Sequence, residues 1–481
     1  MIETYPYTSG KCLINGEWRE IEKTAKVINP AHTNEVVGEV ALCSPELVSE
    51  AIDSAAAAFK GWSRSNIHDR AARMNEAAGE LERIIEESVS LLVRENGKAL
   101  VEAKIDLLRC VDVMRGSAQE LLEWWEPEKY TGKQNVQVRR RPKGVTAVVT
   151  PWNSPMILTF KRVIPAVLTG NTVIVKPATN CPLTIMSFLK VVASYFPAGV
   201  INIVTGSGRV IGDILCSDSR VRTVAFVGST ETGKDIMRKS SSTLQKLYME
   251  LGGNDPAIVF EDANLDKEAI ERLKMGVLRA AGQVCSAVKR IYVHESRYDE
   301  LVEKMTKAFE RVVVGDGIQP EVTMGPLNNE AQFNYVTELL ERTSQSGANV
   351  VTAGIQLDPD TWNQGYFMLP SIVTGVQQDS EIVQAEQFGP VIPILPFSTV
   401  DEAVEMANDS RFGLRASVWT ENEETAIEVA DRLEAGAVFH NNHTIFKDLN
   451  LDFPGLKESG LSRETRHGSL ELFADSYGFA D

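Results

Sequence analysis

The chain has 481 residues, of which 43% are hydrophobic and 24% charged, an ordinary globular composition with enough length for about two to four domains. Its 49 basic and 66 acidic side chains give a formal net charge of −17. A surface that acidic repels phosphate backbones and anionic lipids, so no nucleic-acid or membrane partner is expected, whereas a local cationic pocket for a small anion is not excluded.

The N-terminus lacks a cationic start followed by an apolar run, and no segment approaches the ~18 continuous apolar residues of a membrane span. The six cysteines are scattered along the chain: Cys12, Cys43, Cys110, Cys181, Cys216 and Cys285. Their scatter favours a reducing compartment and argues against a disulfide framework or a thiolate metal cluster. We therefore expect a cytoplasmic protein without a thiolate metal site.

After short β-like pieces, the first quarter of the chain predicts helices. Ser44 and Pro45 are typical of a helix start, and Gly97 is typical of a helix end. Apolar residues recur at helical spacing after Pro45, then over about 67–96, and a further helix is predicted over about 98–126.

From residue 144 the pattern changes to short β-branched runs, at 145–149, 172–175, 200–204 and 223–227. Helix-length segments separate the last three, which is typical of a parallel sheet covered on both faces. A second alternation begins with strands at 257–260 and 291–294 and continues with strands at 391–397 and 416–420. The chain is therefore predicted to form two α/β domains, divided near residue 252.

Two segments have no obvious local core. Residues 130–141 are polar and alternating, and residues 470–479 are apolar and strand-like. We interpret both as arms that pair with another subunit, because exposed strand edges are normally covered. A surface hairpin with a docked tail is the alternative.

Glycine-rich turns offer three candidate phosphate sites. Gly206–Gly212 resembles a dinucleotide fingerprint, but its last glycine comes one residue too late. Gly228–Lys234 resembles a P-loop, but Asp235 replaces the hydroxyl that would hold Mg²⁺, which makes a nucleotide hydrolase a weak alternative. The same turn also fits a helix N-terminus facing a pyrophosphate, with Ser229 as the capping residue, or an ordinary strand-to-helix turn.

Three residues are candidates for catalytic roles. Cys285 lies among small residues, although a lone cysteine is usually a buried small hydrophobe. Glu250 precedes a double glycine in an apolar setting that suits a general base, or it caps a turn. Asn153 lies in a segment bounded by two prolines, where its amide would donate to an oxyanion or stabilise the turn.

These residues belong to a series of motifs whose order resembles the aldehyde dehydrogenase superfamily over nearly the whole chain. The motifs are Pro151-Trp152-Asn153, Lys176-Pro177-Ala178, Phe226 to Glu231, Glu250 to Gly253, Gly282 to Cys285, Glu386 to Pro390, Asn441, and Ser459 to Glu464. Each motif is weak alone, but all of them in order at sensible spacing are a specific signal.

The resemblance implies an α/β fold in three parts. A Rossmann-like cofactor domain would comprise residues 1–126 and 143–252, and a catalytic domain residues 253–452. Residues 127–142 and 465–481 would form a small β bridging arm of a homodimer or homotetramer. A non-enzymatic protein on the same fold is a further alternative, but the joint presence of the site residues argues against it.

The resemblance also implies the roles of individual residues. The Cys285 thiolate would attack the aldehyde, with the oxyanion held by Asn153 and the Cys285 N–H. Hydride transfer to NAD or NADP would leave a thioester, and Glu250 would activate the water that hydrolyses it to the free acid. The remaining roles concern the cofactor: Lys176 and Glu386 for the ribose hydroxyls, Gly228 and Ser229 for the pyrophosphate, and Trp152 and Phe388 for the walls of the cleft.

Three positions depart from the family pattern. Thr179 replaces a glutamate that binds the adenosine hydroxyls in many NAD⁺-preferring relatives, so NADP⁺ becomes acceptable, or NAD⁺ binding is merely looser. Lys161 replaces an aromatic residue of the substrate tunnel, at the position where succinate-semialdehyde and lactaldehyde dehydrogenases carry arginine. Ser154 replaces a common phenylalanine. We expect Lys161 to pair with an anionic or polar substrate tail, unless it turns outward or pairs with a nearby acid.

Smaller features are left with structural interpretations. His440 and His443 have no surrounding metal-ligand set, so no metal is assigned. Arg162 and Glu464 are expected to form a buried ion pair that is either structural or assists proton release from Glu250. The identity of the aldehyde depends on loops around 440–453 and is not predicted.

Overall fold

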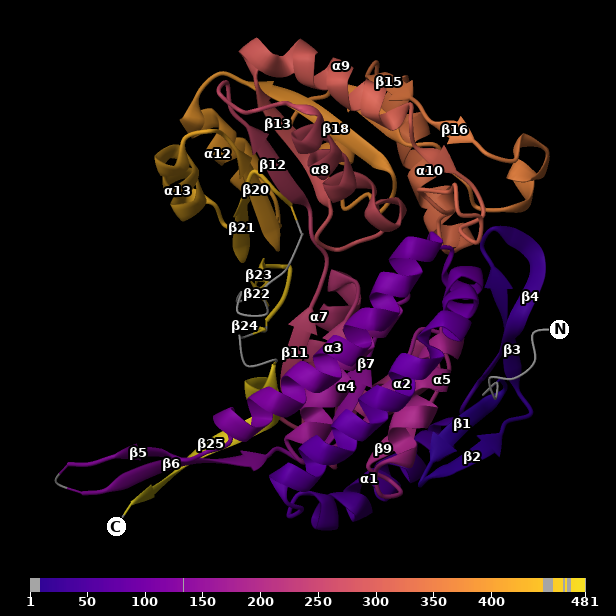
Figure 1. Cartoon of the computed structure of the whole chain (residues 1–481), viewed down its shortest axis with the longest axis vertical. Coiled ribbons are helices and arrows are strands. Elements are labelled where there is room, and N and C mark those ends of the chain that lie inside the picture. The colour runs from indigo at the N-terminus through magenta and orange to yellow at the C-terminus, as the bar shows by residue number, and fades with distance from the viewer. Residues whose placement is uncertain (1–8, 133, 444–452, 462, 465–468, 481) are drawn as a thin grey trace.

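Two sheets, each flanked by helices, form the two lobes of the molecule, and a thin β arm extends from it (Figure 1). This computed structural model describes residues 9–132, 134–443, 453–461, 463–464 and 469–480. The predicted α/β class is therefore confirmed.

The first sheet has seven strands, and its five neighbouring strands from β11 to β9 run parallel. In spatial order the strands are β11 (Lys246–Glu250), β10 (Val221–Val227), β7 (Val145–Val149), β8 (Thr172–Lys176), β9 (Ile201–Ile203), β1 (Lys11–Ile14) and β2 (Glu17–Glu20). The four β-branched runs predicted in this part of the chain all correspond to strands of this sheet.

Helices cover both faces of the first sheet. They are α1 (Pro45–Trp62), α2 (Ile67–Asn96), α3 (Leu100–Trp124), α4 (Pro155–Leu168), α5 (Leu183–Ser194), α6 (Gly208–Ser217) and α7 (Thr230–Ser240). Val148 packs with residues of α2 to α5, whereas its neighbour Ala147 packs with residues of α1, α6 and α7, because successive strand residues point to opposite faces. The predicted helix boundaries are confirmed: Ser44 caps the start of α1, and Gly97 ends α2 in the left-handed conformation.

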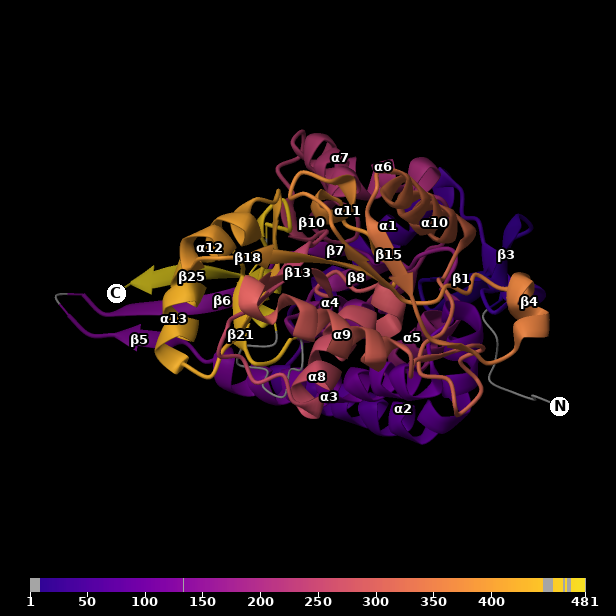
Figure 2. The ribbon, with the colours of Figure 1, turned by 90° about the horizontal axis from the view of Figure 1, so that it is seen from above.

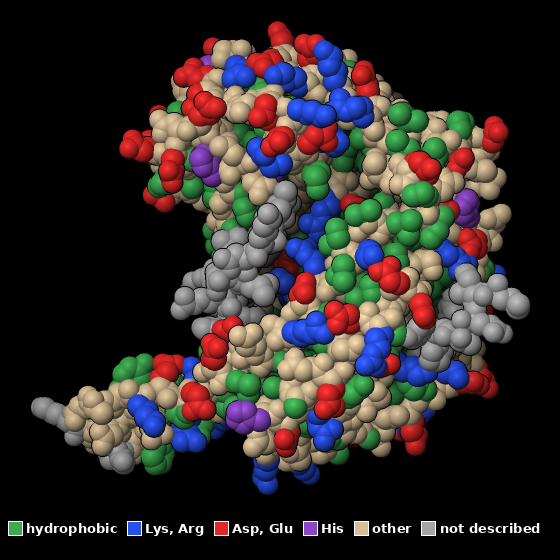
Figure 3. Space-filling model, in the orientation of Figure 1, with side chains coloured by type: hydrophobic (Ala, Val, Ile, Leu, Met, Phe, Trp, Pro, Cys, Tyr) green, Lys and Arg blue, Asp and Glu red, His purple; other side chains and the backbone are tan. Residues whose placement is uncertain are grey.

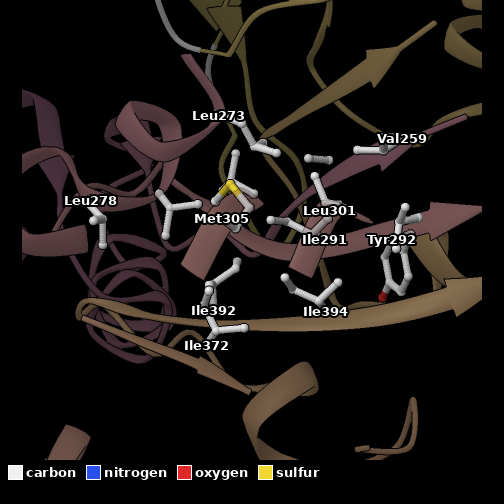
Figure 4. Packing of buried hydrophobic residues seen from close by; sticks show 14 of the residues in the cluster. Val259, Leu273, Leu278, Ile291, Tyr292, Leu301, Met305, Ile372, Ile392 and Ile394 are labelled. Atoms are coloured by element: carbon white, nitrogen blue, oxygen red, sulfur yellow. The ribbon is translucent and has the colours of Figure 1, made fainter. Parts of the chain in front are cut away.

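The second sheet also has seven strands, and most of its neighbours are parallel. They are β15 (Asn349–Thr352), β17 (Ser371–Thr374), β18 (Val391–Phe397), β13 (Val288–His294), β12 (Asp255–Val259), β20 (Arg415–Trp419) and β21 (Ala437–His440). The helices of this lobe are α8 (Lys267–Leu278), α9 (Tyr298–Phe309), α10 (Glu330–Gln345), α11 (Glu381–Gln384), α12 (Val400–Asn408) and α13 (Glu423–Arg432). Figure 4 shows Leu301 and Met305 against the buried isoleucines of β13 and β18.

Shorter elements complete the described chain. Among them are the hairpin β3 (Thr24–Asn29) and β4 (His32–Ala41), the 3₁₀ turns η1 (Arg279–Gly282), η2 (Glu295–Arg297), η3 (Pro359–Gln364) and η4 (Leu470–Phe473), and the strand pairs β14 (Val313–Val314) with β16 (Ile355–Gln356), β19 (Phe412–Gly413) with β23 (Leu456–Lys457), and β22 (Phe453–Pro454) with β24 (Arg463–Glu464).

The arm consists of β5 (Glu128–Tyr130), β6 (Val136–Pro142) and β25 (Ala474–Ala480). β25 pairs with β6 along its full length, so the two predicted arm segments lie side by side in one chain. The expectation of a strand over 470–479 was partly wrong, because residues 470–473 form the 3₁₀ turn η4 and bury Leu470 and Phe473. Figures 1 and 2 show the arm pointing away from both lobes.

No helix in the described ranges is long and apolar enough to cross a membrane. All six cysteines are free thiols, and Cys285 is the most exposed of them.

Candidate active site

The carboxyl ends of the parallel strands bring several predicted site residues to one edge of the first sheet. Val149 pairs with Lys176 across β7 and β8, and Val227 pairs with Glu250 across β10 and β11. Trp152 and Ser229 follow the ends of β7 and β10. This is the edge at which open α/β sheets bind ligands.

Cys285 and Glu250 are in direct contact. The Cys285 thiol donates a hydrogen bond to Glu250 Oε1 at 3.2 Å, and Arg162 donates to Glu250 Oε2 at 3.1 Å. Burial, followed by the Glu250 charge, raises the pKa of Cys285 well above its ordinary value. The sulfur is therefore a protonated thiol at neutral pH, with a proton acceptor already in contact.

The segment from Arg279 to Cys285, here called the nucleophile segment, has an unusual backbone. Ala280, Ala281 and Gly282 all have left-handed φ angles, of 50°, 56° and 74°. A Cβ on Gly282 would lie 2.1 Å from the Gly389 carbonyl oxygen, so only glycine fits there. These turns end α8 and direct Cys285 toward the first sheet.

Close approach of the nucleophile segment also explains the second glycine after Glu250. A Cβ on Gly253 would lie 2.4 Å from the Cys285 carbonyl oxygen. On the other side, the Leu251 N–H donates to the Ser459 carbonyl at 2.8 Å, and Gly460 bridges to Glu250. The Ser459 motif thus supports the strand end that carries Glu250.

Asn153 joins the same cluster. Its side chain is 5% exposed and donates from Nδ2 to the Gln283 carbonyl at 2.9 Å. An amide nitrogen has two hydrogens, so one donor remains for a ligand. The adjacent Ser154 is buried at the N-cap of α4 and makes no side-chain capping bond.

The predicted cofactor residues form a region with a helix N-terminus, an ammonium and two aromatic rings. Ser229 is exposed and caps α7, accepting from the Thr232 N–H at 3.4 Å. Burial lowers the pKa of Lys176 to about 8. The rings of Trp152 and Phe388 meet edge to face, with centroids 5.6 Å apart. The helix end, which can bind an anion, follows β10, and Trp152 of the aromatic pair follows the neighbouring strand β7, an arrangement that fits a dinucleotide.

Glu386 and Thr179 lie at the margins of this region. Glu386 Oε1 accepts from the Gly253 N–H at 3.0 Å, which places it beside the nucleophile segment. Thr179 is half-buried in the turn after β8. Gly228 donates its N–H to the Glu250 carbonyl at 3.1 Å and so links the α7 turn to the strand end of the base.

The P-loop alternative is wrong. α7 begins at Thr230, so most of the candidate loop is the first turn of a helix rather than a loop that surrounds a phosphate. Lys234, which would bind the phosphate, pairs with Glu458 at 2.9 Å. The Gly206–Gly212 alternative also lacks a loop, because α6 begins at Gly208.

Other predicted residues have structural contacts. His443 Nε2 lies 3.1 Å from the Ser286 carbonyl oxygen, and burial lowers the pKa of His443 to about 3, so the ring is neutral. Asn441 pairs with the backbone of Thr420. Within the described ranges no group of three His, Cys, Asp or Glu side chains could hold a metal. The Glu464 side chain, predicted partner of Arg162, lies outside the described residues.

Three basic residues near the nucleophile were not predicted. Lys289 is 2% exposed and donates to three carbonyls of the turn around Cys285. Arg279 begins the nucleophile segment, and its charge, after burial, lowers the pKa of Arg109 on α3. Neither arginine forms a hydrogen bond or ion pair with another described residue. In a single sequence, isolated basic residues at these spacings give no indication that they lie near the nucleophile.

Comparisons with known proteins agree with this geometry. Residues 18–476 match the aldehyde dehydrogenase family. The chain is 34% identical to the α-ketoglutaric semialdehyde dehydrogenase of Bacillus subtilis, over 96% of this chain and 95% of that one. It is 35% identical to the NADP⁺-dependent D-glyceraldehyde dehydrogenase of Picrophilus torridus, over 90% of this chain and 88% of that one.

A solved structure shows the same similarity. The crystal structure of betaine aldehyde dehydrogenase from Staphylococcus aureus, in complex with NAD⁺, superposes with a TM-score of 0.93. It is 30% identical in sequence, and the match covers 98% of this chain and 94% of that one. The chain therefore belongs to the aldehyde dehydrogenase family, and it is an NAD(P)-dependent enzyme that oxidises an aldehyde to a carboxylic acid.

Proposed function

We propose that Cys285 is the nucleophile of this oxidation and that Glu250 is its base. The observation that carries the proposal is the 3.2 Å contact between the sulfur and the Glu250 carboxylate. Glu250 takes the thiol proton as sulfur bonds to the aldehyde carbon, which gives a thiohemiacetal. After hydride leaves, Glu250 releases this first proton to solvent and, as a carboxylate again, takes a proton from the water that hydrolyses the thioester.

The developing oxyanion needs donors on the other side of the carbonyl. The free hydrogen of the Asn153 amide and the Cys285 N–H supply them in this proposal. The Gln283 carbonyl fixes the Asn153 amide at 2.9 Å, and this preorganisation limits the rearrangement needed when the charge develops. Arg162 holds Glu250 by an ion pair at 3.1 Å.

We assign the cofactor to the region of the α7 N-terminus. Gly228 and Ser229 bind the pyrophosphate, and Lys176 and Glu386 bind ribose hydroxyls. When bound, the nicotinamide ring accepts the hydride. Trp152 and Phe388 enclose the cleft. Thr179 brings no negative charge to the adenosine ribose, so we propose that both NAD⁺ and NADP⁺ are accepted.

We propose that the substrate carries an anionic or polar tail. Lys161 is half-buried on α4 one residue before Arg162, and Ser154 starts the same helix. Arg109 and Arg279 add positive charge beside the nucleophile segment, because Glu102 of α3 accepts the Ala280 N–H at 2.7 Å and holds the two elements together.

The surface supports this substrate class. Figure 3 shows Lys and Arg side chains gathered in the recess between the two lobes, on a molecule whose net charge is −17. A cationic recess on an acidic protein concentrates small anions. Among the relatives, the Bacillus subtilis enzyme is named for a semialdehyde.

We also propose the larger organisation of the protein. Residues 1–126 and 143–252 form the cofactor domain, and 253–452 the catalytic domain. In support, β11 ends at Glu250 and the second sheet begins at Asp255. Residues 127–142 and 465–481 form the arm of a homodimer or homotetramer, since the outer edge of β25 pairs with no described strand. A cytoplasmic location is supported by the free cysteines.

A panel of aldehydes tests the proposal. Succinate semialdehyde, α-ketoglutaric semialdehyde, benzaldehyde and butyraldehyde are assayed with each cofactor by the absorbance of reduced nicotinamide. Lys161→Met is expected to lower kcat/KM for the anionic aldehydes relative to benzaldehyde by about 10- to 100-fold, since a charge-assisted contact contributes about 1.5–3 kcal/mol. An unchanged ratio would remove Lys161 from the substrate site, and turnover by Cys285→Ser would remove the nucleophile.

A further inference from the structure

Lys289 contacts the nucleophile through the backbone. It lies on β13, and its ammonium donates to the Val284 carbonyl at 2.8 Å, the Cys285 carbonyl at 2.7 Å and the Ala287 carbonyl at 3.4 Å. The three carbonyls use all three of its hydrogens. An acidic group lies near but not in hydrogen-bond contact, since Glu386 Oε1 is 3.9 Å away.

These contacts fix both peptide groups that flank the sulfur. In a trans peptide the C=O and the N–H point in opposite directions. Because Lys289 holds the Val284 carbonyl, the N–H of Cys285 points away from the ammonium. A cation on a carbonyl also polarises its peptide and makes the N–H of that peptide a better donor.

We propose that Lys289 is a positioning residue that orients and polarises the Cys285 N–H and supplies a buried positive charge that favours the thiolate. The inference rests on the proposed function, in which that N–H is an oxyanion donor. Lys289 touches neither substrate nor cofactor in this scheme; it acts through the peptide groups of the nucleophile.

The carboxylates near Cys285 disfavour its thiolate, which explains why a nearby cation is needed to stabilise that form. Glu250 is in contact with the sulfur and Glu386 is close enough to act on it, and both charges raise the pKa of Cys285 in addition to burial. Arg162 faces Glu250 and balances that carboxylate. Lys289 is the group whose charge lowers the pKa of Cys285, and it acts in the same direction on Glu386.

Two substitutions separate charge from hydrogen bonding. Lys289→Gln removes the charge but keeps N–H donors for the carbonyls, and Lys289→Arg keeps both. The control is Lys304→Met, which removes an ammonium bound to the Leu265 carbonyl at 2.8 Å on α9 of the same lobe. Circular dichroism and thermal melting establish that each variant is folded.

The readout is alkylation of Cys285 by iodoacetamide in the cofactor-free protein, followed by intact mass as a function of pH. Lys289→Gln is expected to shift the profile upward by about one pH unit, which makes alkylation at neutral pH about tenfold slower. Lys289→Arg and Lys304→Met are expected to follow the wild-type profile. In turnover, Lys289→Gln should lower kcat about tenfold or more with little change in KM, because an oriented donor acts in the transition state.

A folded Lys289→Gln protein with the wild-type alkylation profile would overturn the inference, and so would an Arg variant that behaves like Gln. If Lys289→Gln does not fold, the alkylation profile of Lys289→Arg decides. This variant keeps the positive charge, so the inference requires it to keep the wild-type pH dependence of alkylation. Failure of the proposed function has a different signature, namely wild-type protein that oxidises no aldehyde or Cys285→Ser protein that still does.

Discussion

Glu250 has two opposing effects on the sulfur beside it. Its carboxylate accepts the thiol proton at 3.2 Å, which prepares the transfer, but its charge also raises the pKa of Cys285. A thiol with a raised pKa is unreactive until a substrate arrives, because the thiolate is the nucleophile. The contact therefore keeps the resting enzyme protected while the base stays in place.

Replacing this carboxylate should change reactivity and turnover in opposite directions. In Glu250→Gln the neighbouring charge is gone, so the pKa of Cys285 falls and alkylation at neutral pH is about tenfold faster than in wild type. Aldehyde turnover falls by about 10²- to 10⁴-fold, since the base is lost. Intact-mass alkylation and steady-state kinetics on one preparation measure both; slower alkylation would mean that Glu250 activates the resting thiol.

Residues that belong to the family motifs were predictable from the sequence. Cys285, Glu250 and Asn153 were predicted from the family resemblance, and the structure places them in one cluster. Lys289 was not predictable, because its partners are backbone carbonyls, and a single lysine gives no sequence signal for such contacts. The catalytic roles of Cys285, Glu250 and Asn153 stay predictions until their substitutions are measured.

At the level of elements, the nucleophile depends on three consecutive left-handed residues. Ala280 and Ala281 adopt this conformation without the freedom of glycine, at a cost of about 1 kcal/mol or more each. Gly282 continues it and packs against the Gly389 carbonyl. The segment keeps this backbone strain at the place where it positions the Cys285 thiol.

Two Gly→Ala substitutions should therefore have opposite effects on stability. Gly282→Ala forces a Cβ to 2.1 Å from a carbonyl oxygen at a left-handed φ and is expected to destabilise the protein by about 1–3 kcal/mol. Gly79→Ala lies within α2 with nothing within 4 Å and should stabilise by about 0.5–1 kcal/mol. Thermal melting compares them; a neutral Gly282→Ala would mean that this turn is loosely held.

The helices and their caps were predictable from the sequence, whereas the left-handed turn of the nucleophile segment was not. Ser44, Pro45 and Gly97 act locally, so their neighbours in sequence suffice to predict α1 and the end of α2. The alanines after Arg279 favour a helix by their own propensity. Packing against the Gly389 turn, far away in sequence, ends the helix instead.

At the scale of the whole molecule, the two sheets were predictable because their buried strands are continuous apolar runs. The pairing of β25 with β6 was not, since residues 136–142 and 474–480 are more than 300 positions apart and nothing local selects the partner. The arm leaves the outer edges of β25 and β5 without a neighbour among the described strands. Open edges of this kind favour association.

The apolar side chains on the arm give this expectation a direct test. Tyr130, Tyr477 and Phe479 are 57%, 37% and 52% exposed on strands that have little core of their own. In a dimer or tetramer they would be buried, so Phe479→Glu is expected to reduce the particle mass toward that of one 53.0 kDa chain.

Leu244→Glu is the matched control, because Leu244 is 83% exposed on the first lobe and should tolerate a charge without a change in mass. Sedimentation velocity on the three proteins measures the outcome. A wild-type protein that sediments as a single chain, or a Phe479→Glu protein with an unchanged mass, would mean that the arm is a surface hairpin with a docked tail. A loss of assembly in the arm variant alone would assign the subunit contact to the arm, since both substitutions add the same charge.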